Sequence, residues 1–498
     1  MYQNDDVSQL DPSGRAPGTD RAQMIPETIM KLDNQTRRSF LKSTALGAAA
    51  CALPMRSSLA GAGKPVLEVG EGVVDTTPPL GIELHGFHRP VGQERRVRGI
   101  RRATAVRAIM LQLGEVQAAV VSADLLSFSG EMTRRVQQRI AAQLGIPVSN
   151  IRLCATHSHS MPGFRAMRQW GALSPEYMAT FEEKLCQAVE LAKADLAPAA
   201  LSVGKSRAPG ASNNRTMKEG QTWKTDEQFT QDSTDDDRWL DSVVRVLHFE
   251  RGADKRDLLW YHFSAHPVCF QDELAGPDWP GMVEDLIQQR FQLAPSYLQG
   301  HCGDVNAGDA THWIGSIENT AEPVAAAIAS ALDSARSVPV DQLRVATQQF
   351  PMPLDIDTFR QWLDEYRADP SKCTSGNWVD AGFAEDWYRG SAQRDLSQTT
   401  LPIPLSVMQL GEVGLVFHPG ELYSCYGLMI QRDSPLPETL VVGYTDDSIG
   451  YLPDPNAYRD AEYSAVTVPK IIDLPPFLPT STRTMTAGAI AMLKQLIA

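Results

Sequence analysis

Apolar and polar positions alternate along the chain in two rhythms. The apolar runs at 117–123 and 150–155 have the length of single buried strands. Segment 131–144 instead repeats apolar residues three and four positions apart and is followed by glycine, which is typical of a helix and its end. A second helix is expected after Ser174, because serine followed by proline is a common helix start. This order of strand and helix predicts an α/β fold.

Two stretches interrupt the alternation. Residues 225–241 are rich in aspartate but lack the spacing of a calcium-binding loop, so we expect a solvated surface excursion there. Residues 355–400 hold a helix that we expect to be capped by Asp357, together with many aromatic side chains. Two interpretations of this segment remain open: a lid or wall of a substrate pocket, or a helical excursion packed on the core.

The N-terminal residues follow neither rhythm. Residues 1–35 are polar, and the sequence TRRSFLK that follows them, with a short apolar stretch behind it, resembles a twin-arginine export signal. We therefore divide the chain into a disordered N-terminus with its signal, 1–62, and one folded domain, 63–498. A periplasmic or secreted protein is expected, and lipid attachment at Cys51 is the alternative to simple cleavage.

Composition excludes several classes of protein. The 498 residues carry a formal net charge of −14 and no block of lysine and arginine in the body of the chain, which argues against nucleic acid as a partner. No apolar run reaches the roughly 18 residues of a spanning helix, so the mature chain is expected to have no transmembrane segment. The cysteines are irregularly spaced without a CxxC pair, which predicts neither a disulfide framework nor a cysteine zinc site. The oligomeric state stays open.

Histidines at the expected ends of strands are the first candidates for chemistry. His157 and His159 follow the apolar run 150–155, and on an extended chain side chains two apart point to the same side. His266 comes at the end of another apolar segment and precedes a proline that stops strand pairing. Imidazole nitrogens from two strand ends are suitable ligands for zinc, which takes about four nitrogen, oxygen or sulfur donors.

An acidic ligand is expected to complete such a site. Residues 413–417 are apolar and strand-like, a proline and a glycine form a turn, and Glu421 follows. Further along, the stretch YTDDSIGYLPDPNAYRDAEYS brings several tyrosines into one polar loop. Each signal alone occurs in many enzymes, but together they favour a metal site.

Six short motifs, in order, resemble those of the neutral ceramidase family. They are GVVDTTPP with GIELHGF, THSHSMPGF, SNNRTM, FSAHPV, GDVNAG and HPGELYS, and the resemblance extends over about residues 66–495. It implies a catalytic domain of mixed β-sheets flanked by helices. It also implies zinc-dependent hydrolysis of an amide bond in a small N-acyl or lipid-like substrate such as a sphingolipid.

The resemblance also implies roles for individual residues. His159 matches the histidine that assists the reaction, and Arg215 matches the arginine that holds the substrate or its carbonyl. The twelve positions from Tyr451 to Tyr463 agree with a pair of tyrosines at the family's site, which makes Tyr463 a second donor. The zinc ligands that the resemblance implies are His157, His266, Glu421 and Tyr451.

Departures from the family pattern leave the substrate open. Asn306 stands where the family has a serine, which excludes a serine nucleophile there and leaves a water mechanism. Met161 and Phe164 replace glycines and are expected to reshape the pocket. The family's C-terminal immunoglobulin-like domain is also expected to be missing. The acyl and amine parts of the substrate are therefore not fixed.

Other functions and roles are also weighed. An ester or lactone hydrolase using the same site and a non-catalytic metal-binding homologue remain alternatives. A TIM-barrel amidohydrolase would carry its HxH pair on the first strand, whereas about ninety residues of the mature chain precede it here. His301, Asp304 and Asp124 are candidates for orienting the ligands from behind.

Overall fold

The computed structural model describes residues 65–218, 220–252, 254–308 and 314–498. The twin-arginine segment and Cys51 lie outside the described residues, so the export signal and the lipid attachment stay predictions. The chain from Lys64 to Ala498 forms one compact unit.

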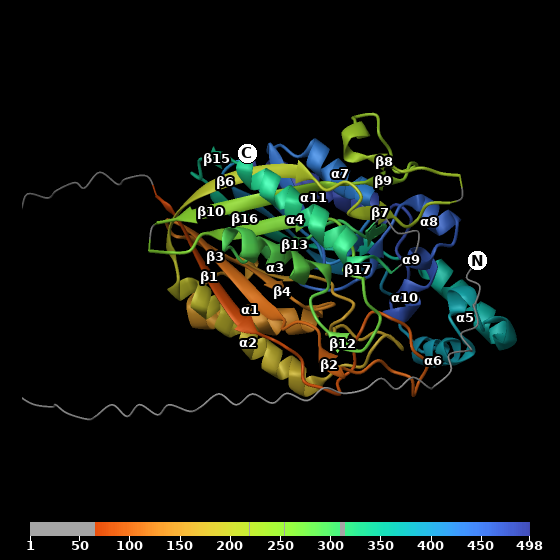
Figure 1. Cartoon of the computed structure of the whole chain (residues 1–498). Helices are drawn as coiled ribbons and strands as arrows, with labels where there is room; N and C mark the ends of the chain where they lie inside the picture. The colour runs from red at the N-terminus through yellow and green to blue at the C-terminus, as the bar shows by residue number, and fades with distance from the viewer. Residues whose placement is uncertain (1–64, 219, 253, 309–313) are drawn as a thin grey trace, which may run out of the picture. The chain divides into compact units, whose positions relative to one another are not determined.

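The largest sheet has nine strands and is mixed (Figure 1). Its strands pair antiparallel except for the parallel pairs β4 with β5 and β11 with β13. One further strand, β15 (Arg336–Val338), pairs with β6 outside the main order. In sheet order the strands are β13 (Ser296–Gln299), β11 (Leu258–Phe263), β10 (Val243–Arg251), β6 (Ala197–Arg207), β1 (Leu67–Asp75), β3 (Ala105–Leu113), β4 (Val116–Ala123) and β5 (Ile151–Ala155).

A second, four-stranded sheet packs against the first. Its order is β16 (Leu343–Pro353), β17 (Thr400–Leu410), β18 (Val413–Phe417) and β20 (Glu438–Val442), and β18 and β20 run parallel. Side chains from both sheets share one buried cluster, in which Val120 and Trp260 from the large sheet meet Leu415 and Leu440 from the small one. The molecule therefore has two sheets face to face, and each sheet buries both of its faces.

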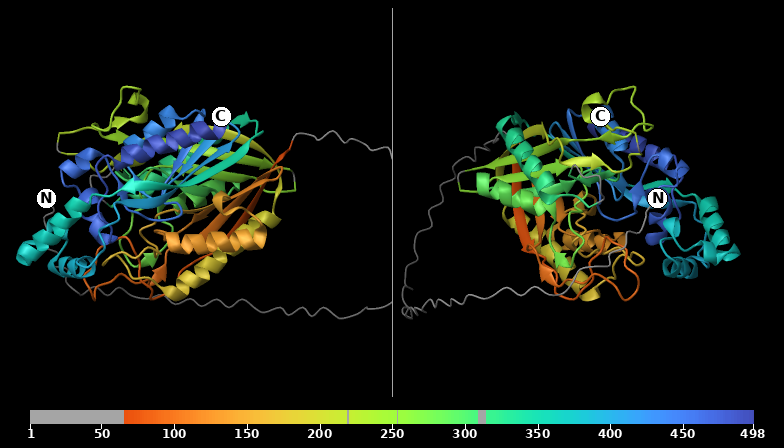
Figure 2. Two further views of the ribbon diagram at one scale, coloured as in Figure 1. Left: turned by 180° about the vertical axis from the view of Figure 1, so that it is seen from behind. Right: turned by 45° about the vertical axis from the view of Figure 1, so that its right-hand side comes forward.

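Helices cover the two outer faces (Figures 1 and 2). The large sheet shares a buried cluster with α1 (Gly130–Leu144), α2 (Pro175–Ala194), α3 (Trp279–Phe291) and α4 (Ile317–Asp333). The small sheet is covered by α7 (Ser424–Asp433) and α11 (Ser481–Ile497). Figure 2 shows α11 in dark blue across the strands. This arrangement confirms the predicted fold of mixed sheets flanked by helices. Because the large sheet is open and mixed, the TIM-barrel alternative is wrong.

Short pairs of strands and short helices lie in the loops beyond the two sheets. In the described part of the chain, none of the helices is long and apolar enough to cross a membrane. The pairs are β2 (Gly99–Ile100) with β12 (Leu274–Ala275), β7 (Ser212–Asn214) with β14 (Val305–Ala307), β8 (Lys224–Thr225) with β9 (Trp239–Leu240), and β19 (Glu421–Leu422) with β21 (Tyr451–Leu452). The short helices are α8 (Pro455–Arg459), α9 (Tyr463–Val466) and α10 (Val468–Ile471).

The segment 355–400 forms α5 (Ile356–Ala368) and α6 (Ala381–Ser391), with 3-10 turns between them. The cap of α5 is Asp355, whose carboxylate accepts a hydrogen bond from the Thr358 backbone N–H, so the prediction of Asp357 as the cap is wrong. The tryptophans of the segment are buried, and the ammonium of Lys470 from α10 lies 3.8 Å from the centre of the Trp362 ring. The segment packs as a helical excursion.

The acidic stretch 225–241 is only partly a surface loop. Asp235 and Asp241 are buried, which contradicts the expectation of a solvated excursion for these two positions. Asp235 accepts a hydrogen bond from the Tyr426 hydroxyl at 2.5 Å, and Asp241 pairs with Arg245 at 3.0 Å. The two carboxylates therefore anchor the stretch, because a buried charge requires a partner.

Trp260 tests how far the domain depends on the core between the two sheets. It is fully buried there, and replacing it with alanine is expected to cost about 3–5 kcal/mol of unfolding free energy, through lost burial and an unfilled cavity. Trp223 is 41% exposed and serves as the control, since its replacement with alanine is expected to change stability by less than about 0.5 kcal/mol. Urea unfolding followed by circular dichroism measures both. Equal losses in the two variants would contradict the sandwich core as the main source of stability.

Candidate metal centre

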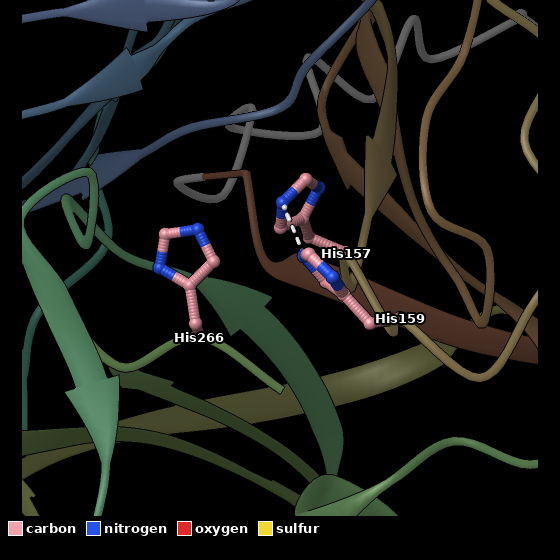
Figure 3. Close-up of side chains that lie close together, drawn as sticks. All are labelled: His157, His159 and His266. Atoms are coloured by element: carbon pink, nitrogen blue, oxygen red, sulfur yellow. Dashed lines mark hydrogen bonds between the residues drawn. The ribbon is translucent and has the colours of Figure 1, made fainter. Parts of the chain in front are cut away.

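The predicted ligands lie just beyond the carboxyl ends of strands that belong to parallel pairs. His157 follows β5, His266 follows β11, and Glu421 follows β18 after a tight turn. The first two strands lie in the large sheet and the third in the small one, so the site forms where the two sheets meet at one end. Figure 3 shows His157, His159 and His266 pointing toward one another.

The distances describe a compact cluster of donor atoms. Nε2 of His157 lies 3.3 Å from Nε2 of His159, and Nε2 of His266 lies 3.1 Å from Oε2 of Glu421. The same carboxylate oxygen lies 3.6 Å from Nε2 of His157. One ligand nitrogen from each of the three histidines falls within 4.8 Å of the others. The donors are thus close enough to share one ion.

The two neighbouring histidines meet for a different reason than the one predicted. Strand β5 ends at Ala155, and His157 has a φ angle of 66°, in the left-handed region. The chain therefore turns at His157 instead of continuing as an extended strand, and the backbone N–H of His159 bonds to the carbonyl of Pro267 at 3.1 Å. The prediction that an extended chain aligns these side chains is wrong, although their rings do lie side by side.

Main-chain carbonyls fix the orientation of all three imidazoles. Nδ1 of His157 lies 2.9 Å from the carbonyl oxygen of Leu126. Nδ1 of His159 lies 3.0 Å from the carbonyl oxygen of Gly86, and Nδ1 of His266 lies 2.9 Å from that of Val305. A carbonyl only accepts hydrogen bonds, so each Nδ1 carries the proton. In a neutral ring, Nε2 then has a free lone pair, and these three lone pairs converge.

Burial keeps the three rings neutral. Desolvation lowers the pKa of His157 to about 4 and holds the pKa values of His159 and His266 well below their usual 6.5. Three neutral nitrogen donors and a carboxylate then face one another without a proton to share. Such a set repels itself unless a cation lies among the donors, and imidazole with carboxylate suits zinc better than magnesium or calcium. The residues therefore fit the metal that the sequence implies.

Tyr451 is brought to the same place by strand pairing. In the short parallel pair β19 and β21, Glu421 lies in register with Tyr451, and the Tyr451 ring stacks near His266 with centroids 6.4 Å apart. The Tyr451 hydroxyl accepts a hydrogen bond from Arg215 at 2.6 Å. Burial raises the Tyr451 pKa well above 10, and the guanidinium of Arg215 opposes that rise.

Arg215 is itself firmly held. Besides Tyr451, its guanidinium donates to the carbonyl of Gly303 at 2.7 Å and to the side-chain oxygen of Asn306 at 3.1 Å. Burial alone lowers the pKa of Arg215, but Tyr451 and Glu421 outweigh it and raise the pKa above its usual value. Arg215 is therefore a fixed cation beside the donor cluster.

Comparison with known proteins identifies the family to which the chain belongs. Residues 67–321 match the family described as neutral/alkaline non-lysosomal ceramidase, N-terminal. The chain belongs to this family. A search of curated proteins finds no significant match.

Solved structures support the fold of this ceramidase-family protein. The crystal structure of neutral ceramidase from Pseudomonas aeruginosa is similar with a TM-score of 0.66 and 16% identity, covering 87% of this chain and 75% of that one. A structure described as ceramidase complexed with C2 gives the same score and identity and covers 87% of this chain and 76% of its own. At this identity the likeness establishes a shared fold.

The remaining predicted residue, Tyr463, lies at the outer side of the centre. It begins α9, is 42% exposed, and its ring packs edge-on against that of Tyr451 with centroids 6.2 Å apart. The structure thus brings the seven predicted site residues of this ceramidase-family protein into one region. Which of them bind an ion and which move protons remains a prediction.

Asp304 supports the centre from behind. One carboxylate oxygen accepts hydrogen bonds from the backbone N–H and the hydroxyl of Ser424, and the other accepts one from the amide of Asn214. Since Arg215 and Glu421 lie close to these partners in sequence, one buried carboxylate aligns three loops. His301 pairs with Asp241 at 3.2 Å, and Asp124 accepts a hydrogen bond from the backbone of Ala105, so neither contacts the donor cluster through these bonds.

Two residues of the ceramidase-family centre are not among those predicted from the sequence. Gly86 has a φ angle of 99°, and a Cβ atom there would lie 2.7 Å from Nδ1 of His159, so only glycine lets the loop approach the ring. The second glycine of the motif GIELHGF, Gly86, is the sequence signal for this contact. Tyr444 stacks on His157 with ring centroids 4.0 Å apart, and its position in a loop with several tyrosines gave no hint of that.

Buried histidines predict that the metal-free protein loses stability in acid. The folded-state pKa of His418 is lowered by burial to about 3, below the roughly 6.5 of an unfolded chain. The unfolded state therefore binds more protons as the pH falls below about 6.5, and the unfolding free energy decreases by up to about 1.4 kcal/mol per pH unit for this group. Replacing His418 with leucine should flatten the curve by that amount between pH 6 and pH 4.

The difference in unfolding free energy between the wild type and the leucine variant isolates the contribution of His418. Asp278 and Asp454, whose pKa values are raised to about 6 by burial, act in the opposite direction but are present in both. Urea unfolding at half-unit pH steps provides the measurement. Parallel stability curves for the wild type and the leucine variant would show that His418 does not titrate as its burial requires.

Proposed function

We propose that this protein is a zinc-dependent hydrolase that cleaves an amide bond of an N-acyl substrate with water as the nucleophile. The observation that supports this most is the convergence of three neutral Nε2 atoms and one carboxylate. These donor atoms are close enough to bind one cation, and no proton lies between them. Zinc in such a site lowers the pKa of bound water to near 7 and polarises a carbonyl oxygen. His157, His266 and Glu421 would hold the ion, with Tyr451 beside them.

His159 is proposed to move the proton. Its Nδ1–H is committed to the carbonyl of Gly86, so Nε2 is the atom that accepts, and burial keeps the ring neutral at pH 7. A neutral imidazole at the edge of the donor cluster can take a proton from water and return it to a leaving amine. His159 is the least buried of the three histidines, which suits a group that meets substrate.

Arg215 is proposed to stabilise the oxygen on which negative charge develops. Its guanidinium is fixed by Gly303, Asn306 and Tyr451, so stabilising that charge requires little movement of the side chain. Tyr463, at the outer side, can donate from its hydroxyl. Asn306 contributes an acceptor for Arg215 and has no hydroxyl to attack, which supports water as the nucleophile.

The family supports an N-acyl, lipid-like small molecule as substrate, and a similar ceramidase has been solved complexed with C2. Esters and lactones present the same carbonyl, so their hydrolysis at this site is the second candidate. A homologue that keeps the ion without turnover is the third. A substrate screen combined with metal analysis distinguishes the three.

Replacing a ligand should remove both metal and activity. His266→Ala and Glu421→Ala are each expected to lose bound zinc and to lower kcat/KM at least a thousandfold, since the ion supplies both nucleophile and electrophile. Asn306→Ser is the matched control, because it lies outside the proposed ligand set and should keep its zinc. Elemental analysis and a screen of N-acyl amides of varied chain length measure both effects. Full zinc occupancy in both alanine variants would refute the proposed ligand set.

His159→Gln separates a base from a ligand. If His159 moves protons, the glutamine variant keeps zinc at the wild-type level and loses activity about 100-fold to 10,000-fold. If His159 is instead a ligand, the variant loses zinc together with activity, as His157→Ala does. Zinc content and kcat, measured on the same preparation, decide between the two roles.

A further inference from the structure

We propose that Tyr444 is a positioning residue of the metal centre, which holds the His157 ring and the Glu421 carboxylate in place at the same time. The inference rests on the proposed metal site, and nothing in the family motifs points to this tyrosine. Two contacts carry it: a stacked ring on one ligand and a hydroxyl directed at another.

The ring contact is close and nearly parallel. The centroids of Tyr444 and His157 lie 4.0 Å apart, with an angle of 29° between the ring planes. At the edge of the ring, Nδ1 of His157 donates a hydrogen bond to the carbonyl of Leu126. A hydrogen bond within the ring plane leaves rotation about that bond open, and a flat neighbour on the face blocks that rotation. The two contacts together leave the imidazole one orientation.

The backbone of Tyr444 is hydrogen-bonded to strand β5, which precedes His157. Its carbonyl accepts a hydrogen bond from Ala155 at 3.1 Å, and the backbone N–H of Asp446 bonds to Leu153 at 2.8 Å. Tyr444 itself has a φ angle of 53°, in the left-handed region that non-glycine residues rarely adopt. The strain at Tyr444 is borne by bonds that fix the tyrosine relative to strand β5.

The hydroxyl belongs to a directed chain of donors. Oη of Tyr444 lies 3.1 Å from Sγ of Cys302 and 3.5 Å from Oε2 of Glu421. A carboxylate only accepts, so the phenol donates to Glu421, and the thiol of Cys302 then donates to the phenol oxygen. This is the arrangement in which each buried group finds a partner. It holds the Glu421 oxygen that also faces His266 and His157.

Loss of these contacts has separable consequences. Tyr444→Phe removes the hydroxyl but keeps the stacked ring, whereas Tyr444→Leu removes both. Supporting groups behind a metal ligand typically change metal affinity by 10-fold to 100-fold. We expect Tyr444→Phe to weaken zinc binding about 10-fold and Tyr444→Leu to weaken it further.

The experiment measures the zinc affinity of the full folded protein by competition with a chelator, and the melting temperature of the metal-free form. Tyr458→Phe is the matched control, since it removes the same atom from a partly buried tyrosine of α8 in the same loop region. The proposal expects Tyr444→Phe to melt within about a degree of the wild type without metal, yet to bind zinc more weakly. Cys302→Ala should show a smaller loss of affinity, because the phenol retains Glu421 as its acceptor.

The possible failures are distinguishable. If the wild type binds zinc and Tyr444→Phe binds it equally well, the positioning role is overturned while the proposed function stands. If Tyr444→Phe and Tyr458→Phe weaken binding to the same extent, the effect is not specific to the ligands and the proposal also falls. If the wild type binds no zinc, the metal site itself is refuted.

Discussion

The hydrogen bond from a ring nitrogen to a main-chain carbonyl is the interaction on which this centre depends. Each of the three histidines makes one, to a carbonyl of a neighbouring segment of the chain. Because a carbonyl cannot donate, it decides which nitrogen of each ring carries the proton. The backbone therefore determines the tautomer of each imidazole. The convergence of the three lone pairs, which makes the cluster suited to hold a metal ion, is a consequence of where these carbonyls point.

The sandwich of two sheets explains why the proposed ligands are scattered along the chain. His157 and His266 belong to strands of the large sheet, whereas Glu421 and Tyr451 follow strands of the small one. Face-to-face packing brings the ends of both sets together, and the buried carboxylate of Asp304 joins the loops between them. Two of the family motifs therefore help to align the loops of the site, because Asn214 of SNNRTM and Ser424 of HPGELYS are hydrogen-bond partners of Asp304.

Local pattern was sufficient for much of the fold. Strand β18 occupies the predicted residues, helix α1 differs from its prediction by one residue, and the histidines and Glu421 do follow strand ends. These features depend on short-range spacing, which a single sequence displays. The expected α/β class followed from the same rhythm, while the pairing of two separate sheets required contacts between residues more than two hundred positions apart.

The positions that were wrongly predicted or not predicted share a physical origin. Asp235 and Asp241 were expected at the surface because their distant partners, Tyr426 and His301, cannot be recognised as such from the sequence. The left-handed turn at His157 was hidden for a similar reason, since hydrogen bonds to distant loops stabilise it. Tyr444 gains its place from the parallel pairing of β18 with β20, which no local pattern reports. Tertiary partners, more than propensity, decided each of these positions.

Asn306 stands at the position where the family resemblance implies a serine, and its side chain bears on the proposed mechanism. Its amide oxygen accepts from Arg215, a role that a serine hydroxyl can also fill, so the guanidinium keeps its support whichever residue is present. What differs is reactivity, because an amide does not attack a carbonyl and forms no acyl intermediate. The short strand pair of β14 with β7 holds position 306 against Asn213 and keeps this side chain beside Arg215. Asparagine at position 306 thus gives Arg215 an acceptor and offers no hydroxyl, which supports water as the nucleophile of the proposed reaction.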